Sequence, residues 1–93
     1  MDRPVRIEAW VEGFVQGVSF RYHARRKAIQ LNLHGFVRNL SDGRVHTLFE
    51  GKHDDAREFI KWLQTGPSMA SVRNLETKEL EFLGNYTTFE ISF

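Results

Sequence analysis

The sequence of 93 residues contains no cysteine. This absence excludes a disulfide-stabilised scaffold, a zinc site built from thiolates and an enzyme with a cysteine nucleophile. The sequence also lacks any apolar run near the roughly 20 residues that a membrane-spanning helix needs, and its first residues show no signal-peptide core. We therefore expect a small soluble protein of the cytoplasm that does not associate with membranes.

Internal repeats, linkers and low-complexity stretches are absent as well. Hydrophobic residues make up 41% of the chain and charged residues 27%, which is the balance of a globular protein rather than a disordered one. A chain of this length supports one domain, so we expect a single domain over residues 1–93.

The net charge of +1 hides an asymmetry between the two halves of the chain. Residues 1–48 carry eight Lys and Arg against four Asp and Glu, whereas residues 49–93 carry five against eight. A basic first half suggests that an anionic ligand binds there. The excess is too small to indicate a protein that binds long nucleic acids.

Alternation of apolar and polar residues predicts several strands. Residues 41–43 (Ser-Asp-Gly) separate two of these strands and are a hairpin signal. In the last strand Phe89, Ile91 and Phe93 share one face. The strands are expected at residues 5–12, 35–40, 44–50, 72–82 and 87–93.

A period near 3.6 predicts two helices. The first runs from Arg21 to about Leu31, and the second follows Asp54, which we expect to cap it, and ends at Gly66-Pro67. The order of elements predicts an α+β fold of the ferredoxin-like βαββαβ type. Its antiparallel-rich sheet would carry two helices on one face and a short extra C-terminal strand.

The stretch between the first strand and the first helix, residues 13–21, suits an anion. Backbone N–H groups converge where a strand passes into a helix, and the helix dipole favours negative charge there. Gly13 and Gly17 can take positive φ, so that successive N–H groups turn inward. Arg21 opens the helix, where a cation opposes the dipole unless a bound phosphate offsets it. A glycine-bearing turn with a solvated Arg is the alternative, and local physics leaves both open.

The hairpin region contains a second candidate, Asn39, whose carboxamide can donate and accept hydrogen bonds at once. An Asn beside a hairpin turn commonly serves the turn itself, so a catalytic and a structural role both remain open. The histidines are scattered without metal-ligand spacing, and we interpret none of them as a metal ligand. They are His23, His34, His46 and His53.

Taken together, these two stretches resemble the acylphosphatase family. The first reads Gly13-x-Val15-Gln16-Gly17-Val18-x-Phe20-Arg21. The second reads Gly35-Phe36-Val37-Arg38-Asn39, followed by Gly43-x-Val45 and Gly51. The resemblance continues to Phe89-x-Ile91-x-Phe93 and so covers essentially the whole chain, with mild departures at Phe14, Ser19 and Lys52.

The resemblance implies an enzyme that hydrolyses the carboxyl–phosphate bond of small acyl phosphates to a carboxylate and inorganic phosphate. By motif match, Arg21 and the N–H groups of residues 15–20 would hold the phosphoryl group, and Asn39 would position the attacking water. The catalytic residues would be Arg21 and Asn39, and the phosphate-binding residues would be Val15, Gln16, Gly17, Val18, Ser19, Phe20 and Arg21. It also implies a monomer without metal or other cofactor, which inorganic phosphate inhibits competitively.

Two alternative functions remain, one from a different class of protein and one with a different substrate. A ferredoxin-like sheet can bind RNA through aromatic residues on its open face. Trp10 is expected on that face, but Glu8 and Glu12 flank it and would repel a nucleic-acid backbone. The other alternative is a relative that acts on carbamoyl phosphate in hydrogenase maturation. Such relatives usually form part of a much longer protein, so we expect an ordinary acylphosphatase.

Overall fold

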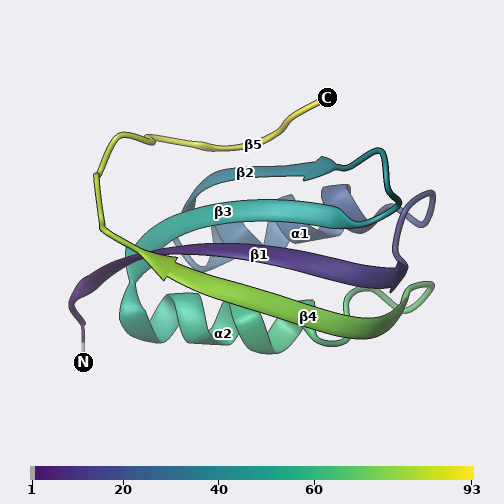
Figure 1. Ribbon diagram of the computed structural model, residues 1–93. Coiled ribbons are helices and arrows are strands. Elements are labelled where there is room, and N and C mark those ends of the chain that lie inside the picture. Colours follow the sequence, from purple (N-terminus) through teal and green to yellow (C-terminus); the bar gives the residue numbers. More distant parts are fainter. Residues whose placement is uncertain (1) are drawn as a thin grey trace.

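The computed structural model describes residues 2–93, which form one sheet with both helices packed on the same face (Figure 1). This arrangement confirms the predicted ferredoxin-like α+β fold, and most element boundaries agree with the sequence-based ones within two residues. The elements are β1 (Pro4–Phe14), α1 (Phe20–Gln30), β2 (His34–Asn39), β3 (Val45–Lys52), α2 (His53–Leu63), β4 (Ser71–Leu80) and β5 (Phe89–Ile91).

The order of the strands across the sheet is β4-β1-β3-β2-β5. β1 and β2 each pair antiparallel with β3, whereas β5 pairs parallel with β2. The carboxyl ends of β1, β2 and β5 therefore lie at the same end of the sheet, here called the Asn39 end. The loop into α1 starts from this end, and the end of the chain reaches it as well (Figure 1).

The core lies between the sheet and the two helices. β1 contributes its alternating residues Val5, Ile7, Ala9 and Val11, all of them buried, as the sequence pattern predicts. Burying one large apolar side chain contributes about 1.5–3 kcal/mol, so these faces hold the helices to the sheet. The helices contribute Phe20, Ala24 and Ala28 from α1 and Ala56, Phe59 and Leu63 from α2.

The start of α2 differs from the prediction. The N-cap residue is Lys52, with extended backbone, and Asp54 lies inside the first turn, so the prediction that Asp54 caps this helix is wrong. β3 leads into α2 without a loop, and the His53 N–H donates to the Arg3 carbonyl at 2.9 Å. Asp54 still lies where a carboxylate interacts favourably with the helix dipole.

The last strand is shorter than the alternation suggests. β5 spans only Phe89–Ile91, and the Ser92 N–H donates to the Val37 carbonyl at 2.9 Å. Phe89 is buried, but Phe93 lies outside the strand and is fully exposed, so the expected strand does not extend to Phe93. Phe93 lies beyond the last of these backbone contacts and is free of the core.

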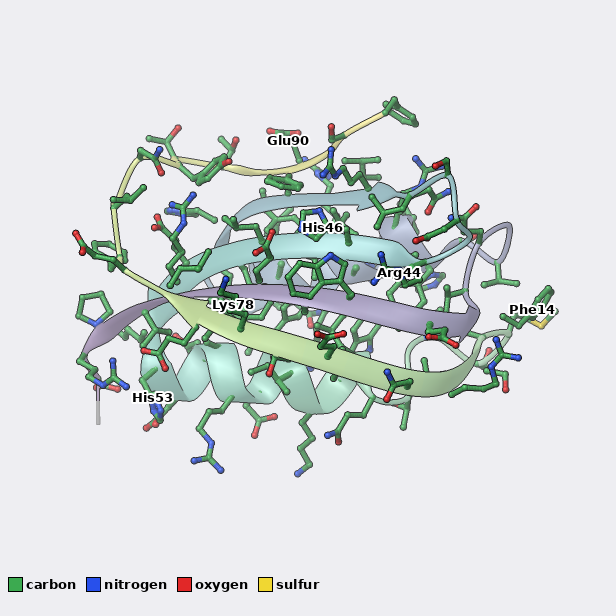
Figure 2. The ribbon with its side chains drawn as sticks, viewed as in Figure 1. Phe14, Arg44, His46, His53, Lys78 and Glu90 are labelled. Carbon is green, nitrogen blue, oxygen red and sulfur yellow. The ribbon has the colours of Figure 1, made fainter. Side chains whose placement is uncertain are left out.

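The face of the sheet away from the helices carries a polar network centred on the buried His46 (Figure 2). Arg38 Nε donates to His46 Nδ1 at 3.0 Å, which leaves the proton on Nε2 to be donated to Glu8 at 2.8 Å. Trp10 lies on this face as predicted, and its ring stacks on the imidazole at 5.4 Å between centroids.

Candidate active site

The loop after β1 depends on two glycines for different reasons. Gly13 lies at an irregularity in the pairing of β1 with β4, where an added Cβ would collide with the Ser71 carbonyl. Gly17 has open space around it but a φ of +78°, a conformation that costs other residues energy. Gly13 therefore allows close approach of β4, and Gly17 allows the loop to turn.

The first turn of α1 presents N–H groups without a side-chain cap. Its N-cap residue, Ser19, has a left-handed backbone (φ 60°), makes no capping hydrogen bond through its hydroxyl, and precedes a turn with no acidic residue. The Ser19 carbonyl accepts from the His23 N–H at 3.1 Å and from His23 Nδ1 at 2.8 Å. The conformation is thereby fixed, and the positive end of the helix stays available to an anion.

Arg21 adds a full positive charge to this helix terminus. Its guanidinium lies over the ring of Phe93, with 4.9 Å between Cζ and the ring centroid. Among residues 2–93, no carboxylate lies within ion-pair distance of Arg21. The protein therefore leaves this charge unneutralised, in contrast to Arg6, which donates to Glu50 at 2.8 Å.

Asn39 is the last residue of β2 and pairs with Val45 across the hairpin. Its side-chain Oδ1 is buried, and no group within residues 2–93 donates a hydrogen bond to it. A buried acceptor without a donor costs about 1–3 kcal/mol. Because folded proteins satisfy nearly all such groups, this oxygen is a candidate acceptor for a water or a ligand.

Gln16 ties the loop to the β2–β3 hairpin. Its Nε2 donates to the Leu40 carbonyl at 2.8 Å and to the Arg44 carbonyl at 3.0 Å. These two carbonyls flank the turn at residues 41–43, immediately after Asn39. One side chain therefore sets the position of the loop between β1 and α1 relative to Asn39.

A pocket of about 170 Å³ lies at the Asn39 end of the sheet and brings most of the predicted site residues together. Arg21 of α1 and Asn39 of β2 both line it. Two predicted residues do not: Gln16 is turned to the hairpin, and Val18 packs against the core. The lining residues are Val15, Gly17, Ser19, Phe20, Arg21, Tyr22, Asn39, Ile91 and Phe93.

Three lining residues, Tyr22, Ile91 and Phe93, were not predicted as site residues. The parallel course of β2 and β5 explains how the last two reach the pocket, because both strands end at the Asn39 end. The alternation of the last strand predicts that Ile91 lies on the same face as Phe89. It does not predict that Phe93 is exposed. None of the four histidines lines this pocket.

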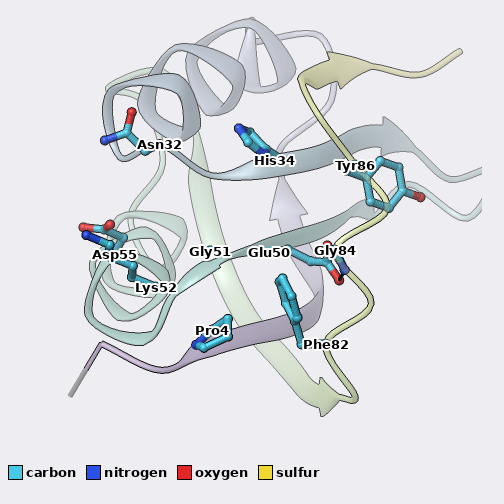
Figure 3. Close-up of a pocket in the computed structure, with 10 residues that line it drawn as sticks. All are labelled: Pro4, Asn32, His34, Glu50, Gly51, Lys52, Asp55, Phe82, Gly84 and Tyr86. Carbon is cyan, nitrogen blue, oxygen red and sulfur yellow. Dashed lines mark hydrogen bonds between the residues drawn. The ribbon is translucent and has the colours of Figure 1, made fainter.

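A larger pocket, about 360 Å³, lies at the opposite end of the sheet, here called the Glu50 end (Figure 3). The Glu50 carboxylate, directed toward Gly84 in the figure, accepts from the N–H groups of Leu83 at 2.9 Å and Gly84 at 3.1 Å and from Arg6. Burial alone would raise the pKa of Glu50, but these hydrogen bonds together hold it below its ordinary value. Its polar groups are thus engaged in holding residues 83–84.

Two kinds of feature are absent from residues 2–93. No helix in this range is long and apolar enough to cross a membrane. No group of three or more His, Asp or Glu side chains within it is placed to hold a metal ion.

Comparison with known proteins gives a consistent result. The sequence model of the acylphosphatase family matches residues 7–91. An acylphosphatase from Syntrophobacter fumaroxidans is 40% identical over 88 residues, covering 95% of this chain and 91% of the relative.

Solved structures agree. An acylphosphatase from Coxiella burnetii superposes with a TM-score of 0.91 at 37% identity, covering 96% of this chain and 93% of that one. Full-length HypF in a phosphate- and nucleotide-bound form superposes with a TM-score of 0.89 at 29% identity, but this chain spans only 12% of its length. The chain therefore belongs to the acylphosphatase family and is an enzyme that hydrolyses acyl phosphates.

Proposed function

We propose that Arg21 and the N–H groups of residues 15–20 hold the phosphoryl group of the substrate while Asn39 positions the water that attacks it. The observation that carries this proposal is the pairing, in one pocket, of an unneutralised guanidinium with a buried amide oxygen that accepts no hydrogen bond within residues 2–93. The first group suits an anion, and the second suits a water O–H.

The phosphoryl group binds where three sources of positive charge converge. Arg21 can donate two N–H groups to two phosphoryl oxygens at once. The uncapped first turn of α1 and the loop around Gly17 add backbone N–H donors. Charge that spreads over the phosphoryl oxygens in the transition state is stabilised by donors already in place.

Asn39 aligns the nucleophile. Its Oδ1 accepts a hydrogen bond from the water and directs an oxygen lone pair of that water toward phosphorus. The Gln16 amide maintains this alignment, because it fixes the loop to the hairpin beside Asn39.

The reaction is an in-line displacement at phosphorus. The water oxygen forms a bond to phosphorus as the bond from phosphorus to the carboxyl oxygen breaks, and the carboxylate leaves with the electron pair. A carboxylate leaves without protonation, so the enzyme needs no general acid. The proton of the water passes to a phosphoryl oxygen of the substrate, and the products are a carboxylate and inorganic phosphate.

We further propose that residues 1–93 work as one monomeric domain in the cytoplasm, without a metal ion, and that inorganic phosphate competes with the substrate as a product. Nucleic acid is not a ligand in this proposal. Trp10 is stacked on His46 and lies beside the Glu8 carboxylate, an arrangement that disfavours base stacking.

The test is steady-state hydrolysis of benzoyl phosphate by the purified protein in EDTA, with inorganic phosphate titrated in. We expect turnover that EDTA leaves unchanged and that phosphate inhibits competitively. Turnover that EDTA abolishes would contradict the metal-free route. Phosphate binding without turnover would direct attention to carbamoyl phosphate, and turnover without phosphate competition would contradict the proposed anion loop.

A further inference from the structure

One wall of the pocket consists of residues outside the set that we propose for phosphoryl binding. Tyr22, Ile91 and Phe93 line it together with Arg21 and Asn39. The Tyr22 and Phe93 side chains are largely or wholly exposed, and Ile91 is partly exposed. Apolar surface left in contact with water beside a polar catalytic group is typical of a substrate subsite.

The position of this wall is fixed by the fold. Arg25 of α1 donates from Nε to the Phe89 carbonyl at 3.0 Å, and the Gly35 N–H donates to the Thr88 carbonyl at 2.9 Å. Together with the contact from the Ser92 N–H to β2, these bonds hold residues 88–92 against the sheet and α1. Phe93 comes directly after these residues, so its backbone is held beside the pocket.

The ring of Phe93 lies beside the charge that binds the phosphoryl group. Its centroid is 4.9 Å from Arg21 Cζ, so an acyl group attached to a phosphoryl group at Arg21 emerges next to the ring. Glu90, the neighbour of Ile91 in β5, does not line the pocket and lies 3.8 Å from Arg25, so its charge is paired outside the wall.

We propose that Phe93, with Ile91 and Tyr22, forms the acyl subsite and favours apolar acyl groups, aromatic ones in particular. This inference rests on the proposed phosphoryl-binding role of Arg21. An aromatic acyl group packs against the ring of Phe93 and removes apolar surface of both from water. A small acyl group such as acetyl reaches little of this wall and gains little from it.

A competing explanation is that the ring of Phe93 serves only to orient the Arg21 guanidinium. The two explanations differ in what they predict for different substrates. A subsite changes the preference between acyl groups, because only the larger group contacts it. An orienting ring changes phosphoryl binding, which all acyl phosphates share.

The experiment compares benzoyl phosphate with acetyl phosphate for the wild-type protein, Phe93→Ala and Phe93→Leu. For Phe93→Ala we expect kcat/KM for benzoyl phosphate to fall about 10-fold and that for acetyl phosphate to change by less than about 2-fold. Phe93→Leu keeps apolar surface and should retain part of the preference. The inhibition constant for inorganic phosphate should be the same in all three proteins.

Phe82→Ala is the matched control, because Phe82 is 41% exposed and lines the pocket at the Glu50 end, away from the Asn39 end of the sheet (Figure 3). It should leave both substrates unaffected. An equal loss on both substrates in Phe93→Ala, or no loss on either, would overturn the subsite. Failure of the proposed function is a separate result, seen as wild-type protein that phosphate does not inhibit.

Discussion

The two ends of the β2–β3 hairpin differ in whether a buried polar side chain has hydrogen-bond partners. At the Glu50 end the carboxylate accepts hydrogen bonds from Arg6 and from the N–H groups of Leu83 and Gly84. At the Asn39 end the buried Oδ1 accepts none within residues 2–93. The first arrangement holds the chain together, and the second leaves bonding capacity for something else.

This contrast distinguishes a structural site from a candidate catalytic site better than pocket volume does. The pocket at the Glu50 end is about 360 Å³, roughly twice the 170 Å³ of the pocket at the Asn39 end. The smaller pocket nevertheless contains the unneutralised Arg21 and the unsatisfied Asn39. Unmet bonding capacity, rather than pocket volume, is therefore our reason for placing the candidate active site at the Asn39 end.

Arg21→Ala should have the largest effect on activity. It removes the charge that we propose holds the phosphoryl group, so kcat/KM for benzoyl phosphate should fall by about 1,000-fold or more, which corresponds to about 4 kcal/mol. Competition by inorganic phosphate should disappear as well. Stability should not fall, because no ion pair is broken. Arg57→Ala, on the exposed side of α2, is the control. Normal phosphate competition in Arg21→Ala would refute the proposed role of Arg21 in phosphoryl binding.

Asn39→Ala should separate binding from turnover. We expect kcat to fall by about 100- to 1,000-fold, since the water loses its acceptor, while the inhibition constant for phosphate changes by less than about 2-fold. Thermal unfolding should show equal or higher stability, because a buried unsatisfied oxygen is removed. Asn74→Ala, exposed on β4, serves as control. Normal kcat in Asn39→Ala would show that the amide does not position the water.

Glu50→Ala should affect stability rather than chemistry. Removing one partner of a buried ion pair leaves Arg6 without a charged partner, and we expect a loss of about 3–5 kcal/mol in the free energy of unfolding, measured in urea. The folded fraction should keep normal kcat for acetyl phosphate. The double variant Arg6→Met/Glu50→Leu should recover much of the lost stability. If it is instead as unstable as Glu50→Ala, the broken ion pair is not the cause of the stability loss.

The pH dependence of stability follows from the same group. The pKa of Glu50 is lowered in the folded protein from its ordinary value of 4.5, so the carboxylate contributes stability above that pH. This contribution is lost as the pH falls through the lowered pKa. Wild-type protein should therefore lose stability below about pH 4.5, and Glu50→Gln should lose less of it over the same interval. Parallel curves for the two proteins would contradict this assignment.

Gln16→Leu should give the smallest effect. The variant keeps the size of the side chain but removes the donor to the Leu40 and Arg44 carbonyls, so the loop is less well positioned relative to Asn39. We expect kcat/KM to fall about 10-fold and the melting temperature to fall by about 5 °C. Gln16→Glu should be worse, because a carboxylate would face two carbonyl oxygens. Wild-type kinetics in Gln16→Glu would refute the clamp.

Much of the fold could be predicted from the sequence because its signals are local. Alternation placed Val5, Ile7, Ala9 and Val11 on one buried face of β1, as the structure confirms. The cap of α2 was wrong because β3 passes directly into the helix, so that Lys52 takes the N-cap position ahead of Asp54. A polar residue before an apolar stripe indicates that a helix begins nearby, but it does not identify the N-cap residue itself.

The candidate site was predictable only in part. The motifs identified Arg21 and Asn39, and the structure places both in one pocket, while their roles stay predictions. The contact of Phe93 with Arg21 depends on the parallel pairing of β5 with β2, which no local pattern encodes. The Glu50 contacts with Leu83 and Gly84 depend in the same way on where a distant segment crosses the sheet.

The position of β1 between β3 and β4 has a consequence for how this protein folds. Within β1, Arg6 pairs with Glu50 on one side and with Leu80 on the other, so one partner comes from the middle of the chain and the other from much nearer its end. A nascent chain on the ribosome cannot pair β1 on both sides until β4 has emerged, and loops of such length make ordering slow. Until then one edge of β1 has no partner strand, which makes this the interval in which the chain is most exposed to aggregation through that edge.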